Sequence, residues 1–163
     1  MLTATVRQIR DADWPAVVVL EAAAYRDLGL SERPERLRTR AADATSFVLE
    51  ADGDIAGYLL AHPLPYGRFP VLAHPGPPPR PTSNLHLHDL VVASGYRRAG
   101  AGSRLLEHLL TAARACAYLQ VSLVSVAGSD AFWTTHGFRA RPEIPVSADY
   151  GPGAAYMSRT LEE

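Results

Sequence analysis

The chain has 163 residues, a length that fits one domain and can bury a sizeable core without disulfides or a structural metal. Its 16 Lys+Arg, all of which are arginine, stand against 17 Asp+Glu and leave a formal net charge of −1. This balance excludes the global basic field that drives nonspecific binding to DNA or to anionic membranes. We therefore expect a single domain over residues 1–163, with neither nucleic acid nor membrane as a partner.

The segment 1–10 alternates polar and apolar residues, which argues against a signal peptide. No stretch approaches the roughly 20 apolar residues that cross a bilayer. The one cysteine, Cys116, excludes an intrachain disulfide framework, so a reducing compartment is permitted and we expect a cytoplasmic protein. Because Cys116 lies on an apolar helical pattern, we expect a buried, inert thiol rather than a nucleophile.

The first predicted elements are a strand and two helices. Residues 3–10 are typical of a strand, and Asp11 or Asp13 can cap the helix that follows. Gly29 ends or bends that helix. A second helix, rich in Arg and Glu, is predicted over about 31–42, with one face in water.

A hairpin and a long loop come next. The strand-like runs 46–50 and 55–61 flank Asp52-Gly53, which is a strong hairpin signal because both residues tolerate positive φ. The segment 62–83 is rich in proline, which removes ladder donors and fixes φ. We predict a long loop there.

The middle of the chain predicts a strand, a helix and a second strand. Residues 85–92 are strand-like, and 100–116 carry apolar residues at helical spacing. The next strand, 119–126, shifts its apolar phase, which indicates burial on both faces or a bulge. This strand–helix–strand unit predicts that part of the sheet is parallel.

The last elements are a short helix that holds Phe132 and Trp133, a strand after Gly137-Phe138, and a final strand over 154–161. The whole order is β-α-α-β-β-β-α-β-α-β-β. Because the hairpin makes one part of the sheet antiparallel, we predict a mixed α/β sheet.

The turn 97–102 (RRAGAG) is the most informative segment. It leads from a buried strand into an amphipathic helix, whose first N–H groups are unpaired and carry partial positive charge. Glycines let a backbone approach a diphosphate closely, and Arg97 and Arg98 add charge where phosphates would lie. A P-loop is excluded because the chain has no lysine, and the glycines come too late for a dinucleotide fold. A tight packing turn is the alternative.

The pattern Arg97-x-x-Gly100-x-Gly102, between the strand LHLHDLVV and the helix SRLLEHLL, resembles the acetyl-CoA pyrophosphate motif of the GNAT superfamily of N-acetyltransferases. The segment 132–138 (FWTTHGF) is similar to that family's aromatic-pair and Gly-Phe signature. The hairpin before these motifs and the strands after them are also in the family's order. The resemblance covers essentially the whole chain.

The resemblance implies a GNAT-like α/β (α+β) fold, with a mixed, mostly antiparallel sheet of about seven strands flanked by about four helices and a central β-α-β unit for CoA. The pantetheine arm would lie where the strands 85–92 and 119–126 splay apart, bonded to the first strand like an added strand. A backbone N–H near Leu90 would meet the thioester carbonyl. The residues implied in binding acetyl-CoA are Leu90, Val91, Val92, Arg97, Arg98, Ala99, Gly100, Ala101, Gly102, Ser103 and Phe132.

The sequence departs from the family pattern where the acid is expected. Trp133 replaces the usual tyrosine, and an indole N–H is not a practical proton donor. The asparagine usual near the end of the fifth strand is also absent, with Val126 in that neighbourhood. Tyr150 and Tyr156 are candidate acids because the family's last connection borders the acceptor site. Alternatively, water protonates the leaving thiolate.

Three residues of one strand are candidate bases. His86 and His88 share a face by period-two spacing, and Asp89 lies on the other unless a bulge turns it inward. A water-only route is the alternative. These histidines could also ligate Zn²⁺, but nothing nearby clearly completes a closed site, so no metal is expected.

We therefore expect an N-acetyltransferase that moves an acetyl group from acetyl-CoA to a primary amine of a small molecule, amino acid or peptide, by direct transfer in a ternary complex. The acceptor would enter beside 25–40 and 66–81, and the latter could equally be a disordered loop. A homodimer is compatible with the family resemblance. The alternative function is a catalytically inactive acyl-CoA-binding module of the same fold.

Overall fold

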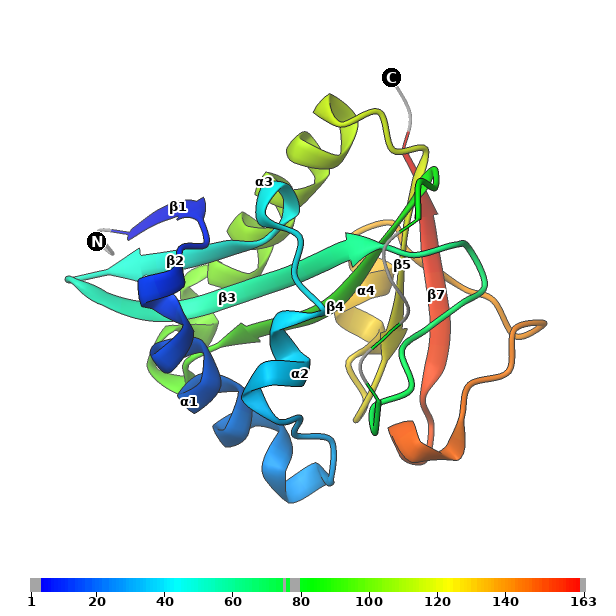
Figure 1. Cartoon of the computed structure of the whole chain (residues 1–163), viewed down its shortest axis with the longest axis horizontal. Helices are drawn as coiled ribbons and strands as arrows, with labels where there is room; N and C mark the ends of the chain where they lie inside the picture. The colour runs from blue at the N-terminus through cyan, green and yellow to red at the C-terminus, as the bar shows by residue number, and fades with distance from the viewer. Residues whose placement is uncertain (1–3, 75, 77–79, 162–163) are drawn as a thin grey trace.

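The computed structural model of the chain describes residues 4–74, 76 and 80–161. Within them, seven strands form one sheet in the order β1-β2-β3-β4-β5-β7-β6 (Figure 1). The strands are β1 (Ala4–Gln8), β2 (Phe47–Ala51), β3 (Asp54–Pro63), β4 (Asn84–Val92), β5 (Gln120–Ser125), β6 (Arg139–Ala140) and β7 (Ala155–Thr160). The α-helices of this part of the chain are α1 (Trp14–Tyr25), α2 (Pro34–Arg38), α3 (Ala101–Ala115) and α4 (Asp130–Thr135).

The sheet is mixed, as predicted. Only β4 and β5 pair in parallel, and α3 makes the crossover between them; every other neighbouring pair is antiparallel. The predicted order of strands and helices is confirmed, and so is the GNAT-like fold class. The hairpin is also confirmed, since Asp52 and Gly53 both have positive φ, of 53° and 84°.

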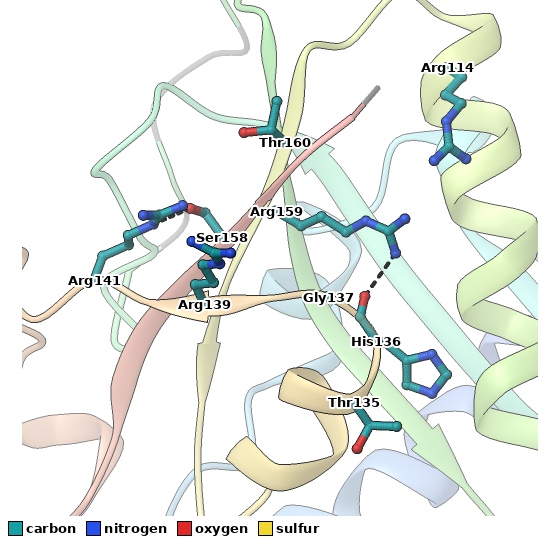
Figure 2. A pocket seen from close by; sticks show the side chains of 9 residues that line it. All are labelled: Arg114, Thr135, His136, Gly137, Arg139, Arg141, Ser158, Arg159 and Thr160. Atoms are coloured by element: carbon teal, nitrogen blue, oxygen red, sulfur yellow. Dashed lines mark hydrogen bonds between the residues drawn. The ribbon is translucent and has the colours of Figure 1, made fainter. Parts of the chain in front are cut away.

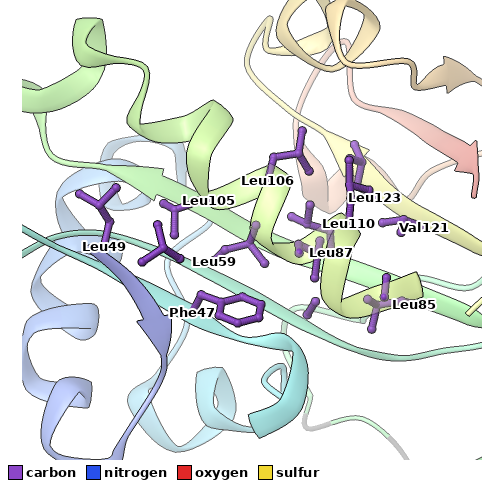
Figure 3. Packing of buried hydrophobic residues seen from close by; sticks show 14 of the residues in the cluster. Phe47, Leu49, Leu59, Leu85, Leu87, Leu105, Leu106, Leu110, Val121 and Leu123 are labelled. Carbon is purple, nitrogen blue, oxygen red and sulfur yellow. The ribbon is translucent and has the colours of Figure 1, made fainter. Parts of the chain in front are cut away.

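Helices cover both faces of the sheet, and each face has its own core. In β3, Leu59 packs against the α3 side, while Tyr58 and Leu60 pack against the α1 side. This alternation follows from the pleat, and the burial of both faces explains why the central strands are nearly continuous runs of apolar residues. Figure 3 shows the α3 side, where leucines of the helix pack on the sheet.

The second helix is shorter than predicted. It ends at Arg38 rather than near residue 42, because the chain then turns inward to join β3. The backbone N–H of Ala42 donates to the carbonyl of Ala61 (2.8 Å), and Arg40 is buried with 1% of its surface exposed. One face of α2 is exposed at Glu35 and Arg38, as expected, whereas Arg40, just beyond the helix, is buried.

The expectation that Cys116 is buried is wrong. The last core residue of α3 is Ala113, and the helix ends at Ala115. Cys116 is its exposed C-cap, and Ala117 adopts a φ of 65° as the chain reverses toward β5. The apolar pattern continues past the point where the helix stops, so periodicity alone placed the thiol in the core.

Candidate active site

The two central strands separate and leave a cleft. β4 and β5 pair only over Asn84–His86 and Gln120–Ser122. Beyond these residues lies a cavity of about 490 Å³ between the strands, the start of α3 and α4. The cleft contains the side chains or backbone of seven of the predicted CoA-binding residues: Leu90, Val92, Arg97, Gly100, Gly102, Ser103 and Phe132.

The remaining predicted CoA-binding residues lie outside the lining of the cleft. Val91 packs on the opposite face of the sheet, and Ala101 is fully buried. Ala99 is exposed, and the backbone of Arg98 lies in a 3-10 turn over Ser94–Ala99. The predicted contacts of these four residues with CoA are made by main-chain groups. The positions of their side chains therefore do not test the prediction.

The glycine-rich turn presents unpaired amides to the cleft. Gly100 caps α3 with a φ of 74°, a conformation that favours glycine. The N–H of Arg104 donates to the carbonyl of Gly100 at 3.1 Å, so the three amides before Arg104 precede the first α-helical bond. A helix N-terminus with free N–H groups beside a cavity is a site for an anion such as a diphosphate.

A bulge in β4 reorganises the candidate bases. Leu60 pairs with Asp89 and Ala61 with Leu87, so His88 is an extra residue in the strand. The bulge turns Asp89 to the face of His88, where Tyr58 donates a hydrogen bond to Asp89 Oδ2 (2.9 Å). Simple alternation had placed His88 and Asp89 on opposite faces.

His88 and Asp89 belong to a buried charged cluster. His88 Nε2 lies 3.8 Å from Asp89 Oδ1 and donates to Glu32 Oε1 at 2.5 Å. Arg40 Nη2 donates to the other oxygen of Glu32, at 2.8 Å. All four side chains are nearly excluded from solvent.

The cluster sets the charges of its members. Burial raises the pKa of Asp89 to about 6, against the opposing attraction of His88. Burial disfavours the His88 cation, but the carboxylates of Asp89 and Glu32 outweigh it and raise the pKa of His88. Burial also disfavours the Glu32 anion, but His88 and Arg40 outweigh it and lower its pKa. The raised pKa of His88 and the lowered pKa of Glu32 both favour the charged forms of this pair, beside the Arg40 guanidinium.

Sequence reasoning missed Glu32. It lies in the segment 25–40 that was predicted to border the acceptor, but no periodicity distinguishes it from its neighbours. Its position comes from tertiary contacts, since buried Glu21 accepts from both Ser31 Oγ (2.5 Å) and the backbone N–H of Glu32 (2.7 Å). This pair of bonds fixes the loop between α1 and α2 and directs Glu32 toward β4.

A smaller cavity of about 40 Å³ adjoins the cleft. Both are lined by Tyr25, His88, Val124 and Val126. The smaller one adds acidic, aromatic and apolar groups, namely Leu30, Glu32, Leu72, Asp89 and Tyr150. The cleft therefore shares part of its wall with a tight, acid-bearing chamber at the bulge of β4.

The described part of the proline-rich segment is an ordered wall of this chamber. Arg40 donates to the carbonyls of Val71 (3.1 Å) and His74 (2.7 Å). Tyr150 donates to the carbonyl of Pro70, and burial raises the pKa of its hydroxyl. These bonds hold 70–74 beside the chamber, which Leu72 lines, and a role of the segment in acceptor selection stays a prediction; residues 75 and 77–79 lie outside the described residues.

The other predicted proton carriers lie away from both cavities. His86 is buried beside Ser122, with Nδ1 and Oγ 2.9 Å apart, and burial lowers its pKa well below the usual value. Tyr156 accepts the N–H of Gly67 at 2.8 Å. Trp133, which replaces the usual tyrosine, packs edge-to-face on Phe138 in the core and also lines the larger cleft. Of the predicted acids and bases, the structure brings His88, Asp89 and Tyr150 together.

The described residues offer neither a metal-binding cluster nor a membrane-spanning helix. Within 4–74, 76 and 80–161, no group of three or more His, Cys, Asp or Glu side chains is arranged to hold a metal ion. Among the same residues, every helix is too short or too polar to cross a bilayer.

Comparison with solved structures shows the fold in other proteins. Ard1 from Thermoplasma volcanium is 19% identical with a TM-score of 0.75, over 98% of this chain and 99% of that one. The ribosomal-protein-S18-alanine N-acetyltransferase from Escherichia coli is 17% identical with a TM-score of 0.74, over 99% and 96%. The GNAT-like decarboxylase GphF, in complex with isobutyryl-CoA, is 24% identical with a TM-score of 0.77, over 97% and 100%.

No curated protein matches the chain. The solved structures are all less than 25% identical, so they show a shared fold and not a shared substrate. The acetyltransferase (GNAT) family model matches residues 4–138, which span both the hairpin and the two motifs. With most of its length matched and the fold in agreement, the chain belongs to the acetyltransferase (GNAT) family.

Proposed function

We propose that this protein transfers an acetyl group from acetyl-CoA to a primary amine, by direct attack in a ternary complex. One observation supports this best: two adjoining cavities share part of their lining, one at the unpaired amides at the start of α3 and the other at the buried carboxyl of Asp89. The first cavity suits a diphosphate and the second suits an amine that must lose a proton. A GNAT-like relative solved with isobutyryl-CoA supports an acyl-CoA donor.

The donor would be held mainly by backbone. Where β4 leaves β5, the main chain at Leu90–Val92 has no partner strand on that side, so its polar groups can bind the pantetheine amides. The N–H groups from residue 98 to Ser103 would bind the diphosphate. An N–H near Leu90 would stabilise the oxyanion that forms on the thioester carbonyl.

Asp89 would serve as the base. An amine enters as an ammonium and must give up a proton before its nitrogen can attack the thioester carbon. A carboxyl with a pKa of about 6 is ionised at neutral pH, and its burial makes it a stronger proton acceptor than a surface aspartate. Attack forms the C–N bond, the C–S bond breaks, and the thiolate takes up a proton.

Tyr150 is the candidate donor of that last proton. It lines the chamber, but its hydroxyl donates to the Pro70 carbonyl and would have to leave that bond to reach sulfur. Tyr25 lines both cavities and is the second phenol at this end. Comparing Tyr150→Phe with Tyr25→Phe assigns the role: loss of kcat in only one variant identifies the acid, and loss in neither assigns it to water.

The chamber favours a slender cationic amine. Asp89 provides negative charge, whereas the charge of Glu32 is compensated by Arg40 and His88, and tyrosines provide aromatic faces for an ammonium. The volume of about 40 Å³ admits little more than an amino group and the carbon that bears it. Bulky secondary amines should therefore react poorly.

A panel of amino acids, polyamines and short peptides incubated with acetyl-CoA, with release of free CoA thiol as the readout, tests the proposal. We expect turnover with at least one primary amine and its loss in Asp89→Asn. The control Asp54→Asn, which changes an exposed aspartate at the far end of β3, should keep activity.

Trp133 in place of the usual tyrosine favours the second candidate function, an acyl-CoA-binding module without catalytic activity. Tight acetyl-CoA binding with no transfer to any acceptor would establish that alternative.

A further inference from the structure

A larger cavity lies outside the candidate active site. It measures about 850 Å³ and is bounded by α3, the end of α4, β6 and β7 (Figure 2). Four arginines line it: Arg114, Arg139, Arg141 and Arg159. The other lining residues are neutral at pH 7 or histidine, and no described acidic residue is among them. We call this cavity the arginine groove.

Two of these arginines are held in place by uncharged oxygens. Arg159 Nη1 donates to the carbonyl of His136 at 2.8 Å, the bond drawn in Figure 2. Arg141 Nε donates to Ser158 Oγ, also at 2.8 Å. Because neither acceptor carries a full charge, each guanidinium is oriented but not neutralised.

Three arginines elsewhere in the fold are paired with carboxylates, unlike those of the arginine groove. Arg7, Arg38 and Arg40 each form an ion pair with a carboxylate at 2.8 to 3.0 Å. Among the described residues, no carboxylate lies within ion-pair distance of Arg139, Arg141 or Arg159. In a chain whose net charge is −1, this local excess of positive charge is not a general property of the surface.

We propose that the arginine groove binds a small molecule with several phosphate groups, at a site separate from the acyl-CoA cleft. Guanidinium forks match phosphate oxygens geometrically, and several forks in one cavity select for a multivalent anion. A volume of about 850 Å³ is in the range of small-molecule sites. The negative charge of the bound phosphates offsets the mutual repulsion of Arg139, Arg141 and Arg159, which β6, the segment after it and β7 bring together.

His136 separates the groove from the CoA cleft. Its carbonyl accepts from Arg159 on the groove side, while its ring is hydrogen bonded to Ser103 Oγ (3.1 Å) and packs on Phe132. Ser103 and Phe132 both line the cleft. One residue thus lies between two anion sites, so the test must distinguish a separate ligand from the phosphates of CoA itself.

Inorganic tripolyphosphate is a suitable probe, titrated calorimetrically into the whole chain at fixed ionic strength. We expect saturable binding that weakens with added salt, and much weaker binding of orthophosphate. Arg139→Ser/Arg141→Ser should lower the affinity at least tenfold. The matched control Arg26→Ser/Arg68→Ser removes two exposed arginines outside the groove and should change the affinity less than threefold. Arg139→Ser alone, at an exposed position, should weaken binding without affecting the fold.

A repeat of the titration in saturating CoA decides between the two sources of phosphate. Affinity within threefold of the CoA-free value supports a separate site. Loss of tripolyphosphate binding in CoA would show that the groove serves the cofactor and would overturn the proposal. Equal affinities for the two double variants, or no saturable binding by the unmodified chain, would overturn it as well. No acyl transfer is measured, so these outcomes are independent of the proposed enzyme activity.

Discussion

At the scale of single residues, Asp89, the proposed base, carries a cost to stability. Its folded-state pKa of about 6 lies above the ordinary value of 3.8, so the folded chain binds this proton more tightly than the unfolded chain. The favourable contribution of protonated Asp89 is present below about pH 4 and is lost as pH rises through 6. Above pH 6 the buried carboxylate destabilises the fold.

Asp89→Asn should therefore separate activity from stability. We expect kcat/KM to fall at least about 100-fold at pH 8, because the amide cannot accept a proton. The melting temperature at pH 8 should rise relative to the unmodified chain, and the difference should shrink at pH 5. In the unmodified chain, kcat/KM should increase with pH through about 6. If Asp89→Asn keeps the rise of kcat/KM with pH through about 6, another group is the base.

Cys116 gives a second prediction at this scale. Since it is exposed at the C-cap of α3, a thiol reagent should modify it in the native protein at a rate close to that of a free thiol. The residue is remote from the lining of the cleft, so Cys116→Ser should keep acetyl transfer within about twofold. Slow labelling that requires denaturant would mean that the C-cap is covered. The serine variant also removes the protein's own thiol from assays that detect free CoA.

At the scale of elements, Glu32 and Arg40 join three segments. Glu32 precedes α2 and connects to β4 through His88, whereas Arg40 follows α2, pairs with Glu32 and donates to carbonyls of the segment 70–74. A buried pair of this kind has a large desolvation cost, but removing one partner leaves the other charge unpaired. We therefore expect the Glu32–Arg40 pair to position the segment 70–74 beside the chamber rather than to add net stability.

Glu32→Gln should be strongly destabilising for that reason. We expect a loss of about 3–5 kcal/mol in urea unfolding, because Arg40 and His88 both lose a buried counter-charge. Hydrogen exchange should increase in 70–74 and near residue 88, with little change in α3. Glu35→Gln is the matched control, since Glu35 is an exposed residue of α2. A variant as stable as this control would show that the pair does not hold the wall in place.

At the scale of the whole molecule, local patterns predicted much of the architecture. The Asp52-Gly53 hairpin, the amphipathic α3 and the glycine turn each carry a strong local signal, and together they fixed the order of elements. The predictions that failed concern features that are set by tertiary contacts. A bulge in β4 turned Asp89 to the other face, and a hydrogen bond between Ala42 and Ala61 ended α2 early. Glu32 joins the candidate site only through its contact with His88 of β4, which is distant in sequence, so no local pattern could predict it.

The sheet also has a weak seam at its centre. β4 and β5 share three residue pairs, whereas β3 and β4 share seven and β5 and β7 share six. The two parts of the sheet are otherwise joined through the core beneath α3, where Leu87 of β4 and Leu123 of β5 lie in one cluster. A ligand in the cleft contacts both parts, so it should stabilise the fold as a whole rather than one loop.

CoA should therefore raise the melting temperature of the entire chain in a single transition. At 100 times its dissociation constant, a ligand adds about 2.7 kcal/mol, which for a chain of this length corresponds to about 5–10 °C. Gly102→Glu should abolish the shift, because a Cβ at this position meets the Phe132 ring at 3.5 Å and the added carboxylate faces the diphosphate site. Gly95→Glu introduces the same charge where a Cβ meets nothing within 4 Å, and should keep the shift. If both variants lose the shift, charge near the turn rather than the glycine itself governs binding; if both keep it, the diphosphate lies elsewhere.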